Sequence, residues 1–414
     1  MARGNGELIT ALDVGSTKVC CFIARDEGDD TLRVAGIGHQ VSQGIRSGRV
    51  VDMDAVESSI LSAVHAAEQM AGGTIHKVIL NVSGGAPSSN TVTADIAISG
   101  RQVSDGDIVR AFEHAQNGIK LGDREIIHAL PAAYRIDNEK GIREPRGMYG
   151  ARLGVDVHLI SVAAGALKTL KTCVAHCHLD VVSPVVSPYA SGLASLVDDE
   201  MTLGATVIDM GGGTTSIATF YEGEMIYTDT IPIGGIHVTN DIARGLSTPT
   251  MQAERMKTLM GSAIPSPRDE REFIEVPSLG EGDANQTNPI PRSMLIGIIR
   301  PRLEETFELV RNRLNASGFG HMVGRRAVLT GGASQLQGIP ELAGQVLGKQ
   351  VRLGRPWEIQ GLAEATGGPA FSTCAGLLLY AKQKHLEQAR TAAGRPEGAI
   401  RSFGRIGQWL RQNF

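Results

Sequence analysis

One short motif occurs twice in this chain of 414 residues, and the repetition constrains the fold more than any other feature. Residues 11–15 (ALDVG) match residues 207–211 (VIDMG), 196 positions further along, and hydroxyl residues and a second apolar run follow each copy. Two apolar runs joined by a short polar turn are typical of a β-hairpin. A duplicated strand-turn-strand unit predicts two similar α/β domains that face a shared cleft.

The turns of the two predicted hairpins contain the residue types that bind phosphate. Glycine lets the backbone approach phosphate oxygens closely, and the free N–H groups of a tight turn can donate to them. Lys18 adds a cation, while Asp13 and Asp209 can hold a hydrated Mg²⁺ between the two halves. The predicted phosphate-binding residues are Asp13, Gly15, Ser16, Thr17 and Lys18 in the first turn, and Asp209, Gly211, Gly212, Gly213, Thr214 and Thr215 in the second.

A third glycine turn follows the apolar residues 327–329 and leads towards a predicted helix over residues 338–347. Two adjacent glycines remove the side chains that would obstruct a flat adenine and its ribose. The sequence therefore predicts nucleoside contacts from Gly331, Gly332, Ala333 and Ser334.

The composition is that of an ordinary globular protein, with 42% hydrophobic residues, 20% charged residues and a net charge of −4. This balance argues against nucleic acid as a partner. Residues 1–25 lack the pattern of a secretory signal, and no segment reaches 18 apolar residues without a charge, so neither a signal peptide nor a spanning helix is expected. The net charge is uneven, because the chain from Lys382 onwards carries +5 and the rest carries −9.

The five cysteines, an odd number in apolar segments, are expected to be reduced core thiols. Cys173, His176, Cys177 and His178 could imitate a metal cluster, but they fall on one short helical segment without a second pair of ligands. No metal is expected there.

Hydrophobic periodicity organises the rest of the chain. Residues 84–161 read as a separate α+β insert with a helix over residues 105–117, which Ser104 can cap. Residues 261–293, rich in proline, glycine and acidic residues, predict a long loop or a subdomain edge. A helix is expected over residues 295–315, kinked or split at Pro301, and the last helix of the body over residues 369–382.

Five segments, in family order, resemble the motifs of the actin, sugar-kinase and heat-shock-ATPase superfamily. Residues 13–23 and 209–215 resemble its two phosphate motifs, residues 330–335 its adenosine motif, and residues 181–196 and 369–380 its two connecting segments. The sequences LDVGSTK, IDMGGGTT and PIGG, and the position of the insert, are more narrowly similar to the FtsA family of bacterial cell-division proteins, over nearly the whole chain.

The resemblance implies an α/β, actin-like ATPase fold, in which two duplicated domains surround a nucleotide cleft and an FtsA-type subdomain is inserted. The implied parts are subdomain IA (1–83, 164–196 and 370–382), subdomain IC (84–163), subdomain IIA (197–241 and 305–369), subdomain IIB (242–304), a linker (383–398) and a C-terminal amphipathic membrane-targeting helix (399–414).

The resemblance also implies a function. The chain is expected to bind ATP with Mg²⁺, with Glu254 and Lys257 on the adenosine side, to form filaments with itself, and to tether FtsZ to the cytoplasmic face of the inner membrane at the division site. The FtsZ C-terminal peptide is expected to meet subdomain IIB and the helix near residues 300–313, and later division proteins are recruited.

Many ATPases of the superfamily have a Gln or Glu in the first connecting segment to position water, but residues 180–192 contain neither, so weak or no turnover is expected.

The C-terminal residues have an amphipathic pattern of their own. Residues 383–398 read as a flexible linker. Beyond them, at about 100° per residue, the apolar side chains occupy one half of a helix and arginine and glutamine the other, a pattern typical of attachment to anionic lipid. Docking of this helix on its own body is the alternative. The predicted membrane contacts are Ile400, Phe403, Ile406, Trp409, Leu410 and Phe414, with Arg401, Arg405 and Arg411.

Two other functions fit the same fold. A small-molecule phosphotransferase would need an aspartate base facing an acceptor hydroxyl, and would have no use for a basic apolar tail. A chaperone-like ATPase would normally append a peptide-binding domain, for which no residues remain. The sequence therefore favours the nucleotide-dependent scaffold.

Overall fold

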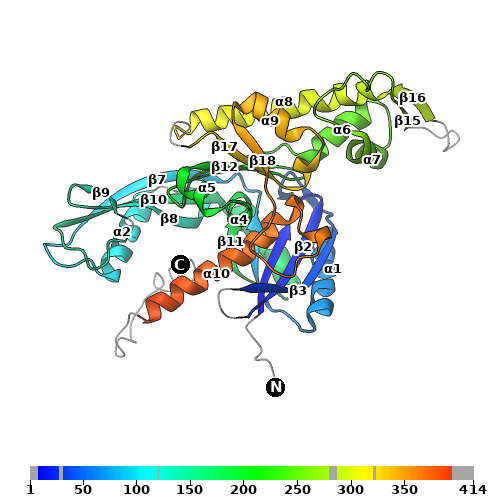
Figure 1. Ribbon diagram of the computed structural model, residues 1–414. Helices are drawn as coiled ribbons and strands as arrows, with labels where there is room; N and C mark the ends of the chain where they lie inside the picture. Colours follow the sequence, from blue (N-terminus) through cyan, green and yellow to red (C-terminus); the bar gives the residue numbers. More distant parts are fainter. Residues whose placement is uncertain are drawn as a thin grey trace.

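The computed structural model describes residues 8–27, 31–119, 121–142, 144–278, 287–319 and 323–393. Figure 1 shows two α/β halves, one above the other, with a smaller module of strands and one helix beside them. The N-terminal strands belong to the lower half and the strands after residue 204 to the upper half, and the last helix returns to the lower one.

The first half has a five-stranded sheet in the order β11-β6-β1-β2-β3. Helices α1 and α3 pack on one face, and α4 and α10 on the other, so the central strands are buried on both sides. The elements are β1 (Leu8–Val14), β2 (Lys18–Asp26), β3 (Leu32–Val41), β4 (Ile45–Arg46), β5 (Arg49–Val50), α1 (Met53–Ala71), β6 (Lys77–Val82), α3 (Ala164–His176), β11 (Asp180–Val186), α4 (Ser187–Ser195), η2 (Glu364–Thr366), η3 (Pro369–Phe371) and α10 (Ser372–Ala393).

The second half repeats this plan with a sheet in the order β14-β13-β12-β17-β18. Helices α6, α8 and α9 cover one face, and the other packs against α4 and the module. The elements are α5 (Asp198–Leu203), β12 (Ala205–Met210), β13 (Thr215–Tyr221), β14 (Glu224–Ile231), α6 (Gly235–Gly245), α7 (Thr250–Met260), β15 (Phe273–Pro277), β16 (Thr287–Pro291), α8 (Arg292–Ala316), β17 (Arg326–Thr330), η1 (Gly332–Gln335), α9 (Ile339–Leu347) and β18 (Gln350–Leu353).

The module is a four-stranded sheet in the order β7-β10-β8-β9, with one helix packed on it. Its elements are β7 (Ser88–Ala97), α2 (Asp105–Asn117), β8 (Arg124–Ile136), β9 (Glu139–Ile142) and β10 (Arg152–Ala163). The chain enters and leaves the module at one place, because Ala163 N donates to Gly85 O at 2.9 Å. The predicted α+β insert is confirmed.

The duplicated hairpins are confirmed, and their registers match. Asp13 is opposite Cys20 in the β1/β2 pair, and Asp209 is opposite Ser216 in the β12/β13 pair. Each aspartate is therefore the last but one residue of its strand and lies directly before a glycine turn. Strands with no exposed face need apolar side chains at successive positions, which explains the continuous apolar runs.

The structure excludes one of the two alternatives in each of two expectations from periodicity. Helix α8 is not split at Pro301, since Ile299 and Leu303 on either side are buried in the core of the second half and this packing offsets the lost backbone hydrogen bond. The segment 261–293, expected as a long loop or a subdomain edge, is not one continuous loop, because it contains the β15/β16 hairpin and the start of α8.

The last helix is also longer than expected. Helix α10 continues to Ala393, although the sequence predicts that the helix ends at Lys382 and a linker follows. Propensity explains the difference, because alanine, glutamine, leucine and charged residues are good helix formers. The predicted membrane-targeting helix, 399–414, lies outside the described residues. Among the residues that are described, no helix is long and apolar enough to span a membrane.

All five cysteines are buried and none forms a disulfide. His176 Nδ1 interacts with Glu57 Oε1 at 2.7 Å. The described part of the chain contains no group of three or more His, Cys, Asp or Glu side chains that could hold a metal.

Candidate functional site

The turns of the two hairpins lie against each other. A Cβ atom added at Gly212 would collide with the side chain of Thr17, and one added at Gly213 would collide with that of Ser16. Glycine is needed at both positions because each half brings its turn within contact distance of the other. The structure thus joins the two predicted phosphate turns, 15–18 and 211–214, at one point between the halves.

The third glycine turn packs behind the second. Gly331 has a φ of 84°, in the left-handed region, and a Cβ there would lie 2.5 Å from Met210 O and collide with the carboxylate of Asp209. At Gly332, by contrast, an added Cβ would meet only Ala370 Cβ, at 3.8 Å. The side of the turn at Gly332 is therefore open, as a purine contact requires.

A fourth turn, between β14 and α6, lies against the second and third glycine turns. Gly235 N donates to Gly211 O at 3.0 Å, and an added Cβ on Gly235 would lie 3.2 Å from Ala333 Cβ and 3.6 Å from Lys257 Nζ. Lys257 Nζ donates to Gly235 O at 3.2 Å and to Thr239 Oγ1 at 2.9 Å, and it forms an ion pair with Glu254 Oε2 at 2.6 Å. The predicted pair therefore lies beside the glycine turns, on α7.

Two buried carboxylates lie at the centre of the site. Asp13 and Asp209 are each 8% exposed. Burial raises the pKa of Asp13 to about 6, an effect that Lys18 opposes and the negative charge of Asp209 reinforces. Burial also raises the pKa of Asp209, against the hydrogen bonds that it accepts from Ser191 and Thr373. The pair holds negative charge that the protein compensates only in part.

Lys18 connects the first turn to the start of α10. Its Nζ donates a hydrogen bond to Ala370 O and lies 3.7 Å from the centroid of the Phe371 ring, in a cation–π contact. The ammonium group is therefore held between the carboxylates and the second connecting segment.

Two of the predicted hydroxyl residues serve the loops themselves. Thr215 Oγ1 donates to Ile233 O at 2.8 Å, and Ser334 Oγ donates to Gly331 O at 2.7 Å; both residues are fully buried. Their side chains fix the shape of the turns and are not available to a ligand.

Several residues that the sequence reasoning missed complete the site. Asn81, at the end of β6, accepts from Val14 N at 2.7 Å and donates to Ser187 Oγ at 3.2 Å. Ser191 on α4 and Thr373 on α10 donate to Asp209 Oδ2 at 2.6 and 3.0 Å. In the sequence, each of these residues is visible only as a polar residue among apolar neighbours. That pattern does not reveal which distant group the side chain binds.

A short turn between β4 and β5 also reaches the site. Ser47 there has a φ of 44°, and the backbone N–H of Gly48 donates to Ser16 Oγ at 3.2 Å. The turn lies beside the second phosphate turn as well, because a Cβ on Gly213 would be 2.9 Å from Ser47 N. Nothing in the local sequence indicates this approach.

The donor set fits a hydrated Mg²⁺ ion. Mg²⁺ prefers oxygen ligands, retains several waters and commonly takes only one or two carboxylates together with phosphate oxygens. Asp13 and Asp209 supply two such carboxylates. Burial raises the pKa of both, and a bound cation would oppose that effect by stabilising the ionised form.

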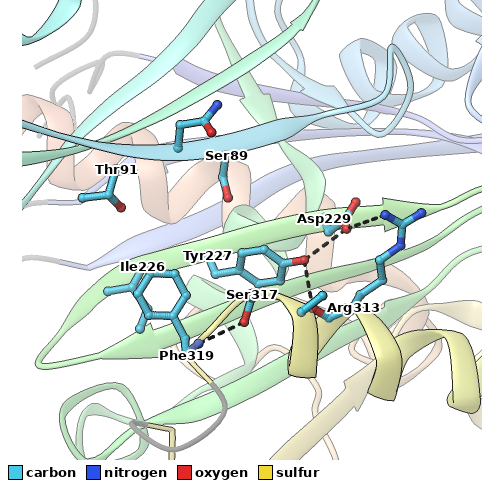
Figure 2. Close-up of a pocket in the computed structure, with 10 residues that line it drawn as sticks. Ser89, Thr91, Ile226, Tyr227, Asp229, Arg313, Ser317 and Phe319 are labelled. Atoms are coloured by element: carbon cyan, nitrogen blue, oxygen red, sulfur yellow. Dashed lines mark hydrogen bonds and ion pairs between the residues drawn. The ribbon is translucent and has the colours of Figure 1, made fainter.

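A separate cavity of about 370 Å³ lies at the seam between the module and the second half (Figure 2). Tyr227 on β14 donates to Asp229 Oδ2 at 3.1 Å, opposite Ser89 on β7, and Ser89 Oγ accepts from Thr228 N at 3.2 Å. Deeper in the seam, the buried His158 donates from Nδ1 to Met225 O at 2.6 Å, and burial lowers its pKa to about 4. The module is therefore fastened to the second half.

The same module is fastened to the first half. Val186 N, at the end of β11, donates to Nε2 of the buried His128 on β8 at 3.1 Å. The module thus contacts both halves close to the point where the chain crosses between them.

Comparison with known proteins identifies similar sequences along the chain. The sequence model described as Cell division protein FtsA matches residues 206–376, and the one described as SHS2 domain inserted in FTSA matches residues 84–161. Cell division protein FtsA of Rhizobium meliloti (strain 1021) is 46% identical over 419 residues, covering 98% of this chain and 95% of that protein. Cell division protein FtsA of Escherichia coli (strain K12) is 32% identical over 416 residues, covering 99% and 98%.

Solved structures share the fold at low sequence identity. The PilM-PilN type IV pilus biogenesis complex aligns with a TM-score of 0.64 and 17% identity, over 92% of this chain and 99% of that one. MreB 5 of Spiroplasma citri bound to AMPPNP aligns with a TM-score of 0.56 and 13% identity, over 94% and 99%. The fold is that of the actin-like ATPases, with an SHS2 domain inserted.

Proposed function

Because this chain belongs to the FtsA family of cell-division proteins, we propose that it is an ATP-binding scaffold that polymerises and tethers FtsZ to the cytoplasmic face of the inner membrane at the division site. The observation that carries the proposal is the meeting of two glycine turns, one from each half, over the buried pair Asp13 and Asp209.

The nucleotide would lie between the halves. Backbone N–H groups of the two turns would donate to its phosphates, and the open side of the 331–334 turn would receive the adenine. Lys257 and Glu254 on α7 would border the ribose. Mg²⁺, held through water by Asp13 and Asp209, would neutralise the phosphate charge. Relatives of the fold support this arrangement, since MreB 5 of Spiroplasma citri is described bound to AMPPNP.

Turnover would be slow, because the polar groups of the first connecting segment are already engaged. Ser187 Oγ accepts from Asn81, and Ser183 is buried with its hydroxyl 3.5 Å from Tyr380 Oη. Asp180 begins β11 opposite Lys77, at the far end of the strand from the phosphate turns. None of these three groups is placed to orient an attacking water.

The FtsZ C-terminal peptide would dock on subdomain IIB. Large apolar side chains are exposed there, as a peptide-binding surface requires: Met251 and Leu259 on α7, Phe273 on β15 and Met294 on α8. The C-terminal helix would attach the scaffold to anionic lipid, and the module, residues 84–163, would meet the next subunit. Later division proteins would join the assembled filament.

Co-sedimentation with anionic liposomes tests the proposal. We expect the full chain with Mg-ATP to carry FtsZ into the pellet, and we expect FtsZ without its C-terminal peptide to stay in the supernatant. Replacing Met251 and Phe273 by Ser should remove FtsZ while leaving the chain itself on the liposomes. Equal recovery of both forms of FtsZ would contradict the tethering function.

A further inference from the structure

A second cavity, of about 250 Å³, lies in the second half at the ends of β12 and β13 that are remote from the phosphate turns. The last turns of α8 and α9, which lie together over the sheet in Figure 1, form its walls with Leu314 and Leu347. Thr206 and Thr219 lie at its floor. The cavity is thus separated from Asp209 by most of the length of β12.

The floor contains two hydroxyl groups without a partner. Thr206 and Thr219 are directly opposite each other in the β12/β13 register, and both are fully buried. Neither Oγ1 atom has a hydrogen-bond partner among the described residues. Burying a hydroxyl without a partner is unfavourable, so a ligand or a water that reaches the floor gains two hydrogen bonds that the protein leaves open.

The rim of the cavity is cationic. Arg311, Arg325 and Lys349 line it, and none of the described lining residues is acidic. Lys349 Nζ donates to Gly324 O at 2.9 Å and Arg311 donates to Val346 O at 3.1 Å, so each side chain is anchored by a backbone carbonyl and keeps further N–H donors for a ligand.

The charge of this rim is only weakly compensated. Glu308 lies 3.7 Å from Arg311, on the exposed side of α8. Burial lowers the pKa of Lys349, which is the behaviour of an ammonium group without a carboxylate beside it. An anion in the cavity would supply the missing partner.

We propose that this cavity binds a small molecule that bears a phosphate group, with Lys349, Arg311 and Arg325 on the phosphate and the two threonine hydroxyls on an oxygen at the floor. A phosphate carries nearly two negative charges and three strong acceptor oxygens, which match three cations better than a carboxylate does. The volume corresponds to about eight water molecules, enough for a phosphate with a short polyol. The source is either free phosphate or a glycerol phosphate such as a lipid headgroup supplies.

This cavity and the seam cavity share part of their lining. Ser317 and Phe319, which follow α8, line this cavity and also the seam cavity of Figure 2. A ligand here therefore lies directly behind the wall that faces the module.

Isothermal titration calorimetry on the full chain tests the proposal. A saturating non-hydrolysable ATP analogue is present throughout, so that the turns between the halves do not contribute to the signal. We expect saturable binding of inorganic phosphate or of glycerol 3-phosphate and none of glycerol. Tighter binding of glycerol 3-phosphate would identify the headgroup source, and equal or tighter binding of phosphate the free anion. Absence of saturation by both below about 1 mM would overturn the proposal.

Variants locate the site. Arg311→Gln and Lys349→Gln should each weaken binding at least tenfold. Arg313→Gln on the same helix and Arg326→Gln beside Arg325 are the controls. Each removes the same charge outside the cavity, and the affinity should be unchanged. Thr219→Val keeps the shape of the side chain and should weaken binding at least threefold. If the control variants weaken binding as much as Lys349→Gln, or if Thr219→Val stabilises the fold without changing affinity, the cavity holds only water. The proposal does not depend on ATP binding, because Arg311, Lys349 and Thr219 line this cavity and lie outside the turns between the halves.

Discussion

Ser191 donates a hydrogen bond of 2.6 Å to the carboxylate of Asp209, and in doing so it ties the first connecting segment to the central acid of the second half. Thr373, on the other connecting helix, donates to the same oxygen at 3.0 Å. The two helices cross closely, since a Cβ on Gly376 of α10 would collide with Ala190 O of α4. A single carboxylate oxygen therefore links both crossings between the halves.

Removing these hydroxyls should affect both stability and ligand binding. We expect Ser191→Ala to lower the free energy of unfolding by about 1–3 kcal/mol, because a buried carboxylate loses one of its two donors, and to raise the pKa of Asp209 further. Urea denaturation measures the loss of stability, and titration with Mg-ATP measures the effect on ligand binding. Thr373→Ser keeps the hydroxyl and is the matched control; a loss as large as that of Ser191→Ala would contradict the role of the hydrogen bond.

Asp13 should make stability fall as pH rises. Its pKa is raised from 3.8 to about 6 in the folded chain, so between these values the unfolded chain has released a proton that the folded chain still holds. The free energy of unfolding should therefore decrease across this interval, by about 3 kcal/mol in total, and stay low above pH 6.

The variant Asp13→Asn isolates that effect. It should be more stable than the wild type at pH 7 and lose the advantage near pH 4, as measured by urea midpoints across the interval. Asp180→Asn, at an exposed site, is the control. A constant difference between wild type and Asp13→Asn at all pH values would refute the assignment.

Gly332 should be critical for ATP although the fold tolerates a side chain there. Leucine at this position would occupy the open side of the turn, and affinity for a fluorescent ATP analogue should fall at least tenfold, about 1.4 kcal/mol. Gly297→Leu on α8, where an added Cβ meets nothing within 4 Å, controls for glycine replacement. Unchanged affinity in the Gly332 variant would exclude the adenine from this turn.

The module should be dispensable for nucleotide binding but required for filaments. Residues 84–163 can be replaced by a short linker, since Ala163 and Gly85 are hydrogen-bonded neighbours. The shortened chain should bind the ATP analogue with unchanged affinity and form no filaments by electron microscopy. Its loss of the hydrogen bond between His128 and Val186 should appear only as lower stability. Filaments of normal length would show that subunits meet elsewhere.

The C-terminal residues should hold the chain on anionic liposomes. Gross burial of six apolar side chains could reach about 9 kcal/mol, but ordering some 15 residues opposes it by about 1 kcal/mol each, so one tail should bind weakly and a filament with many tails firmly. Sedimentation should decrease for Trp409→Glu and for a chain truncated after Glu397. Equal sedimentation of the wild type, Trp409→Glu and the truncated chain would show that the C-terminal residues do not attach the protein to the membrane.

Local patterns in the sequence were enough to predict the hairpins, the glycine turns and the inserted module. The repeat around Asp13 and Asp209 shows in the order of apolar, acidic and glycine residues, because a strand and its turn are determined by neighbours a few positions apart. The continuity of α8 through Pro301 and the end of α10 could not be predicted for the same reason. A local rule ignores the packing that keeps α8 in one piece, and it treats a change of composition as the end of a helix that in fact continues.

Contacts between distant residues could not be read from any pattern. Ser191 and Thr373 meet at Asp209 only because two helices far apart in the chain cross there. Thr206 and Thr219 face one cavity only because their strands pair in one register and the ends of α8 and α9 stop above them. The sequence by itself determined where the paired strands, the two aspartates and the glycine turns lie along the chain. The tertiary structure decided which hydroxyls bind the carboxylate of Asp209 and which have no partner among the described residues, since the choice of partner depends on the geometry of the whole core.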